Sequence, residues 1–248
     1  MSRITQHTRY VLLAGLLVSV SLPVAVRAHD AMHDMHEEPI LSKWMLDRLE
    51  RRFSSSGDST YWEAQAWIGG DINKLWLKTE GSVAQGTSDD ADLEAYYSRA
   101  VSAFWDAQLG VRHDFPSAGG PARDWLGVGM QGLAPYQFDL DGTVYLGDSG
   151  RTALRAKAEY DLLLTQRWVF MPEVEVNAYG QDDPARAIGA GLSDASFTLR
   201  VRYEIRRELA PYAGITWTQK YGNTADYARN AEEPVSTTQY FIGIRAWW

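Results

Sequence analysis

Apolar and polar side chains alternate one by one from about Trp44 to the C-terminus. The alternation is sharpest in SFTLRVRYEI at 196–205, whose apolar positions are Phe197, Leu199, Val201, Tyr203 and Ile205. Successive side chains of a β-strand point to opposite faces, so a period of two predicts strands. The alternating segments are roughly ten residues long, a length typical of membrane-crossing strands.

The connections between these segments are of two kinds. Short links near 70–72, 103–104, 133–135, 163–165 and 207–210 alternate with longer polar links near 55–58, 85–91, 116–122, 147–150, 181–193 and 221–236. A soluble sandwich fits the segments taken singly, because its polar faces meet water. Tight turns at one end and long loops at the other favour an all-β fold, a transmembrane antiparallel β-barrel of the bacterial outer membrane.

Aromatic residues give a second test of the barrel, because Trp and Tyr settle at the two water interfaces of a bilayer. They lie at or near the segment ends, as Trp62, Trp105, Trp125, Tyr136, Trp168, Tyr179, Tyr203, Tyr212, Trp247 and Trp248. The last segment, TTQYFIGIRAWW, ends on an aromatic residue after alternating apolar ones. This ending resembles the terminal strand of bacterial outer-membrane proteins.

The strand count depends on the segment WMLDRLERRF at 44–53. Eleven other strands are convincing, whereas a single-chain bacterial barrel needs an even number. Met45, Leu49 and Phe53 recur at helical spacing, which also permits an amphipathic helix. Parity favours a strand here and about 12 strands in total. A barrel of 10 strands that leaves this segment outside is the alternative.

Two segments precede the predicted barrel at 44–248. Residues 1–28 combine a basic start, an apolar run and small residues before a cleavage position, which predicts a secretory signal peptide. Residues 29–43 form a His- and Met-rich stretch that we predict to be a disordered periplasmic tail. The apolar run of the leader is broken by Pro23 and is shorter than the roughly 20 residues that a spanning helix needs.

The stretch HDAMHDMHEE at 29–38 suggests a metal site. Its candidate ligands are His29, Met32, His33, Met35 and His36. The chain has no Cys, so a soft metal must be held by Met and His. Thioether sulfur suits Cu(I), and imidazole binds either oxidation state of copper, so the segment indicates copper, as Cu(I) or Cu(II), before zinc. A general metal scavenger is the alternative, because His-rich tracts bind several metals weakly.

The strand phases direct many charged side chains into the lumen. The acidic ones are Glu63, Glu80, Asp106, Asp114, Asp139, Asp141, Glu159, Glu173, Glu175 and Glu204, and the basic ones are Arg112, Arg155, Lys157, Arg200, Arg202 and Arg245. Met171 shares the inward phase of Glu173 and Glu175, so these three residues are candidates for a lumen copper relay. The alternatives are ion pairs that only fill the interior and a Met171 that only packs.

Several long stretches resemble a known family. They are WEAQAWIGGDINKLWLKTEG at 62–81, YSRAVSAFWDAQLGVRHDF at 97–115, GVGMQGLAPYQFDLDGTVYLGDSGR at 127–151 and the ending GIRAWW. In these the chain is similar to the outer-membrane copper resistance protein B family of Gram-negative bacteria. The resemblance implies a barrel that works with periplasmic copper-handling proteins. It also implies a Met- or His-rich amino-terminal region, which is short here, at about ten residues.

The expected function is copper resistance or homeostasis, by capturing copper ions or passing them between periplasm and exterior. The 32 acidic residues against 24 basic ones argue against a nucleic-acid partner; outer-membrane lipid and periplasmic copper proteins are the expected partners. An outer-membrane hydrolase is a weaker alternative, because His113 and Asp114 are strand neighbours that point to opposite faces. We therefore expect no enzyme activity. A structural or adhesive barrel is the other alternative.

Overall fold

The computed structural model describes residues 39–84, 87–116 and 120–248. Its strands, in chain order, are β1 Leu41–Phe53, β2 Ser59–Gly69, β3 Asn73–Ala84, β4 Thr87–Ala100, β5 Trp105–Asp114, β6 Arg123–Ala134, β7 Phe138–Gly147, β8 Thr152–Tyr160, β9 Leu162–Leu163, β10 Trp168–Tyr179, β11 Gly191–Tyr203, β12 Leu209–Lys220 and β13 Ser236–Trp247. One helix, α1, spans Gly222–Asn230, and short 3-10 turns lie at Pro135–Gln137, Asp148–Gly150 and Pro184–Arg186.

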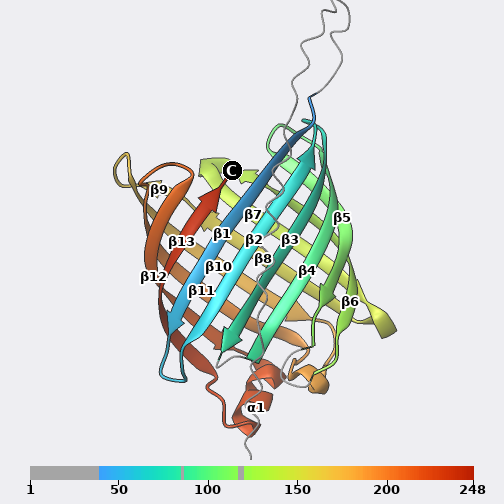
Figure 1. Cartoon of the computed structure of the whole chain (residues 1–248). Helices are drawn as coiled ribbons and strands as arrows, with labels where there is room; N and C mark the ends of the chain where they lie inside the picture. The colour runs from blue at the N-terminus through green and yellow to red at the C-terminus, as the bar shows by residue number, and fades with distance from the viewer. Residues whose placement is uncertain (1–38, 85–86, 117–119) are drawn as a thin grey trace, which may run out of the picture. The chain divides into compact units, whose positions relative to one another are not determined.

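Twelve of these strands form a closed antiparallel barrel (Figure 1). Each strand pairs with its neighbours along the chain, and β13 pairs with β1 to close the cylinder. The two-residue β9 pairs only with the start of β10 and adds no wall strand. The predicted count of twelve is therefore confirmed, and the alternative of ten is wrong.

Strand β1 contains the segment whose spacing also permitted a helix. A β-bulge between Leu46 and Arg48 separates Met45 from the other two residues of that spacing. The extra residue shifts the alternation, so Met45 is buried inside while Leu49 and Phe53 face outward and are exposed. Hydrogen-bonded ladders to both β13 and β2 hold the segment extended. The strand begins at Leu41, ahead of the predicted barrel start at Trp44.

The two ends of the barrel differ in their connections (Figure 1). The short-turn end carries connections 70–72, 101–104, 135–137, 161–167 and 204–208, and both β1 and β13 reach it, where Trp44 and Trp248 exchange backbone hydrogen bonds of 3.0 Å. The long-loop end carries the connections 54–58, 148–151 and 180–190 and the one containing α1, and β3 and β5 both end there.

The predicted long link at 85–91 is wrong. Strand β4 begins at Thr87 and pairs with β3 from that residue onward. The polar sequence TSDDA has low strand propensity, which is why it suggests a loop. Pairing with a neighbouring strand overrides local propensity at this position.

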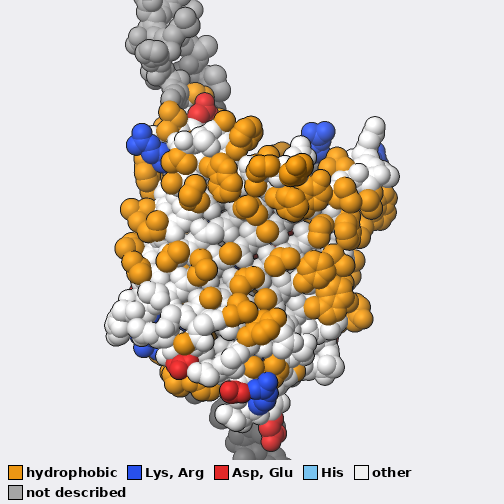
Figure 2. Space-filling view, turned by 180° about the vertical axis from the view of Figure 1, so that it is seen from behind, with side chains coloured by type: hydrophobic (Ala, Val, Ile, Leu, Met, Phe, Trp, Pro, Cys, Tyr) orange, Lys and Arg blue, Asp and Glu red, His pale blue; other side chains and the backbone are white. Residues whose placement is uncertain are grey.

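The outer wall of the barrel is apolar. Figure 2 shows hydrophobic side chains spread over the wall and charged side chains at its two rims. Leu109, Val111, Val128 and Ile242 lie on this wall and are each more than half exposed. In the described part of the chain, no helix has the length and hydropathy needed to cross a membrane.

Candidate functional site

The lumen holds a cavity of about 600 Å³. It extends from Ala103, Phe104 and Leu133 at the short-turn end to Tyr145, deep in the barrel. Nine acidic and six basic side chains line it. This excess of acidic groups favours cations in the cavity over anions.

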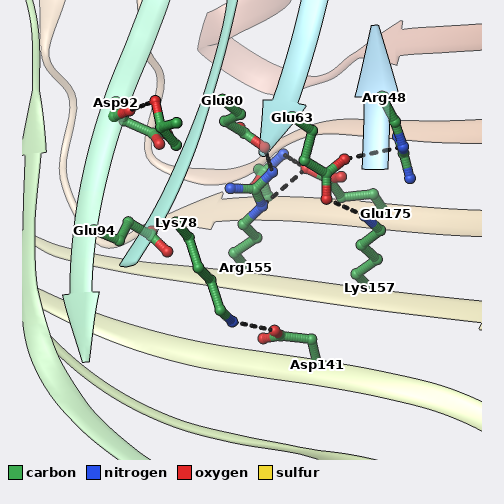
Figure 3. Close-up of polar contacts among 12 residues, drawn as sticks. Arg48, Glu63, Lys78, Glu80, Asp92, Glu94, Asp141, Arg155, Lys157 and Glu175 are labelled. Atoms are coloured by element: carbon green, nitrogen blue, oxygen red, sulfur yellow. Dashed lines mark hydrogen bonds and ion pairs between the residues drawn. The ribbon is translucent and has the colours of Figure 1, made fainter. Parts of the chain in front are cut away.

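An ion-pair network crosses the middle of the cavity (Figure 3). Arg48 on β1 bonds Glu173 on the distant strand β10, and its Nε lies 2.9 Å from Oε2 of Glu63. Lys157 Nζ lies 3.0 Å from Oε1 of the same Glu63. Arg155 reaches Glu80 at 2.5 Å. These contacts join strands on different sides of the wall and keep their charged groups within the lumen.

Strand register explains why the network needs so many cations. Asp139, Glu159 and Glu173 lie directly opposite one another on β7, β8 and β10. Like charges in directly opposite positions destabilise a sheet. Arg48 and Arg200 supply compensating charge, since their guanidinium nitrogens lie 3.8 and 3.6 Å from Oε2 of Glu159.

A second cluster, the Arg112 plug, closes the cavity toward the long-loop end. Its members are Arg112, Asp92, Glu94, Asp114, Trp125, Tyr145 and Tyr96. The Arg112 guanidinium lies 3.0, 3.5 and 2.6 Å from the carboxylates of Asp92, Glu94 and Asp114. Tyr145 donates to Glu94 at 2.8 Å, and Trp125 donates to Asp114 at 2.9 Å.

The plug is tightly packed around Tyr96, which is only 2% exposed. The side chain of Tyr96 lies over Gly110 and Gly127, where a Cβ atom would come within 2.5 Å of its ring and 2.8 Å of its hydroxyl. Only glycine leaves room for the ring at these two positions. A separate space of about 10 Å³ lies beyond Tyr145, beside Arg112 and Tyr179, and has the size of about one water molecule.

Outside the plug, the 180–190 connection and α1 form a cap over the long-loop end. Arg123 bonds both carboxylate oxygens of Asp183, at 2.8 and 3.1 Å, and Arg151 lies 3.7 Å from the same carboxylate. Thr224 of α1 accepts a bond from the Gly189 backbone at 2.8 Å. Burial raises the pKa of Asp183, but the hydrogen bonds and charge of the arginines outweigh it, so the pKa lies below its ordinary value.

The predicted tail ligands His29, Met32, His33, Met35 and His36 lie outside the described residues. Within the described residues, no group of three or more His, Asp or Glu side chains is arranged to hold a metal ion.

Of the predicted lumen relay, Met171 is 3% exposed and lines the cavity. Glu173 and Glu175 are held in ion pairs, Glu173 by Arg48 and Glu175 by Arg155 at 3.1 Å. Met45 also lines the cavity, although the sequence did not single it out. Its apparent helical spacing concealed its inward direction, and only the bulge in β1 reveals it.

His113 and Asp114 point to opposite faces, as predicted. The His113 side chain lies on the outer wall, where its Nδ1 is 2.6 Å from Oδ1 of Asp124. Asp114 faces the lumen and bonds Arg112. This histidine therefore does not contact the carboxylates of the plug.

Comparison with known proteins identifies the family. The model of the family described as "Copper resistance protein B precursor (CopB)" matches residues 40–248. The chain belongs to the copper resistance protein B family. A copper resistance protein B homolog of Pseudomonas syringae pv. tomato is 41% identical over 224 residues, covering 90% of this chain and 76% of the relative. The copper resistance protein B of Escherichia coli is 42% identical over 216 residues, covering 87% and 72%.

Solved structures agree with the fold. The NanC porin superposes with a TM-score of 0.56 at 13% identity, covering 80% of this chain and 98% of the porin. The KdgM porin gives 0.51 at 12% identity, covering 83% and 98%. The protein is therefore an outer-membrane β-barrel of porin-like fold in a copper resistance family. The family's description as a precursor implies a signal peptide, as the sequence predicts.

Proposed function

We propose that this barrel captures copper ions on the periplasmic side of the outer membrane and passes them between periplasm and exterior. The observation that carries the proposal is a lumen cavity with an acidic excess in a chain of a copper resistance family. Bacterial barrels have short periplasmic turns, so we assign the short-turn end, to which the cavity extends, to the periplasm. Lipid and periplasmic copper-handling proteins are its proposed partners.

Copper capture is assigned to the amino-terminal segment through His29, Met32, His33, Met35 and His36. Mixed thioether and imidazole donors suit copper in either oxidation state. The segment precedes β1, which begins at the short-turn end. No enzymatic activity is assigned to the chain.

The lumen relay of Met171, Glu173 and Glu175 is the finer part of the proposal. The ion pairs of both glutamates and the closed plug support capture as the resting state, because passage would require both to rearrange. A structural barrel without a copper role is the second candidate, favoured by the same ion pairs.

The test of the tail is copper titration of the mature protein beside a form lacking residues 29–38. A matched control keeps the length of the segment but replaces its ligands, as His29→Asn, Met32→Leu, His33→Asn, Met35→Leu and His36→Asn. Both altered forms should bind copper more weakly than the unaltered protein. Equal affinity in all three would remove the segment from the function.

Copper flux into liposomes tests the relay. Met171→Leu and Glu173→Gln should each slow the flux if these side chains pass the ion. If neither substitution changes the rate of copper flux, the relay has no role in copper movement, and the structural barrel is favoured.

A further inference from the structure

Two methionine side chains point into a lumen that is otherwise mostly polar. Met45 on β1 is 8% exposed and Met171 on β10 is 3% exposed, and both line the same cavity. Met130, in contrast, faces outward and is 47% exposed. Inward positions of barrel strands are usually polar. Two methionine side chains that face the same cavity depart from this pattern.

The bonded pair of Arg48 and Glu173 gives a common reference for the positions of the two methionines on their strands. Met171 lies two residues before Glu173 on β10, and Met45 is the inward residue that precedes the bulge carrying Arg48 on β1. Both strands run from the short-turn end toward the long-loop end. Met171 therefore lies roughly 7 Å along its strand from Glu173, toward the short-turn end, and Met45 lies on the same side of Arg48.

The charges at this level favour a neutral ligand set. Arg48 and Arg200 both contact Glu173 and Glu159, so these carboxylates are already occupied by guanidinium groups. A hard divalent cation would have to compete with those guanidinium groups for oxygen ligands. Thioethers are neutral and soft, and they bind Cu(I) without needing a free carboxylate.

We propose that Met45 and Met171 together form a binding site for Cu(I) on the periplasmic side of the Arg48–Glu173 pair. The inference rests on the proposed function for the identity of the metal, and it adds Met45 as a ligand. A site in this position would receive an ion that enters the cavity from the short-turn end. The ion would not need to pass the Arg112 plug.

The test is anaerobic Cu(I) titration of the folded mature barrel against a competing chelator. The variants are Met45→Leu, Met171→Leu and the double substitution, with Met130→Leu as the matched control on the outer wall. Leucine nearly conserves the volume of methionine, so all four should fold. The series is repeated with Met32→Leu and Met35→Leu, and X-ray absorption then reports copper–sulfur scattering from the lumen alone.

The proposal expects the double variant to lose one Cu(I) equivalent, and the remaining copper–sulfur scattering with it, while the Met130→Leu protein keeps both. Binding by the double variant equal to that of Met130→Leu would overturn the lumen site and show that both methionines only fill space. Rejection of the lumen site can be distinguished from rejection of the tail ligands, because the tail variants are titrated separately. Loss of copper in the lumen variant with no effect of the tail variants would support the lumen site and overturn the tail assignment.

Discussion

The two halves of the lumen are built on the same strands but filled differently. In the short-turn half, charged side chains from many strands meet around an open cavity of about 600 Å³. In the long-loop half, one guanidinium holds three carboxylates in the Arg112 plug, and Tyr96 is almost wholly buried beside it. Water that enters the open half screens its charges, whereas the plug must neutralise its own charges by direct contact.

This difference predicts which half controls stability and which half receives ions. Removing a charge from the packed half leaves buried carboxylates without compensation. Removing one from the open half exposes its partner to water in the cavity. Four experiments test the contrast.

The largest effect is expected from Arg112→Ala. Three carboxylates would lose their shared cation, so the free energy of unfolding should fall by about 3–5 kcal/mol. Urea unfolding in lipid vesicles, followed by Trp fluorescence, measures this change. Arg112→Lys, which keeps the charge but not the fork of donors, should recover part of the loss. A loss below about 1 kcal/mol would mean that water already reaches the plug.

Accessibility of thiols tests the closure directly, because the chain has no cysteine of its own. Asp106→Cys places a thiol in the cavity, and Asn177→Cys places one beside the small space beyond Tyr145. A membrane-impermeant reagent added at the short-turn side should label position 177 about 100-fold more slowly, which corresponds to roughly 2.8 kcal/mol of local opening.

The control for this experiment combines Asn177→Cys with Arg112→Ala. Labelling of position 177 should then accelerate toward the rate of position 106. Equal labelling of both positions in the unaltered plug would show that the lumen is open from end to end.

The cap should depend on Asp183. Asp183→Asn removes a charged partner of Arg123 and should loosen the 180–190 connection by about 2 kcal/mol, seen as faster proteolysis there. Because the folded state lowers the pKa of Asp183, its stabilisation is complete above the ordinary carboxyl pKa of about 3.9 and is lost as the pH falls below that value. Asp148→Asn, at an exposed carboxylate, is the control and should change little.

The smallest effect is expected from Arg245→Gln in the open half. Arg245 lies 3.4 Å from Asp47, and its side chain is one-third exposed. Water in the cavity can replace this contact, so the free energy of unfolding should fall by less than about 1 kcal/mol in the same urea measurement. A loss as large as that of Arg112→Ala would contradict the distinction between the two halves.

Much of the fold follows from the sequence because strand alternation is local. The period of two in segments such as 196–205 assigns inward and outward faces without any knowledge of neighbours. An even strand count then makes β1 a strand despite its helical spacing. The copper prediction also comes from the sequence, through the Met and His donors of residues 29–38 and the family resemblance.

The tertiary structure alone decided where alternation is interrupted and which inward residues meet. The bulge in β1 turns Met45 into the lumen, and pairing with β3 extends β4 to Thr87. Arg48 and Glu173 are 125 residues apart, yet they bond across the lumen. Such contacts depend on register and closure summed around all the strands, which no local period encodes, so the plug and the thioether pair appear only in the closed barrel.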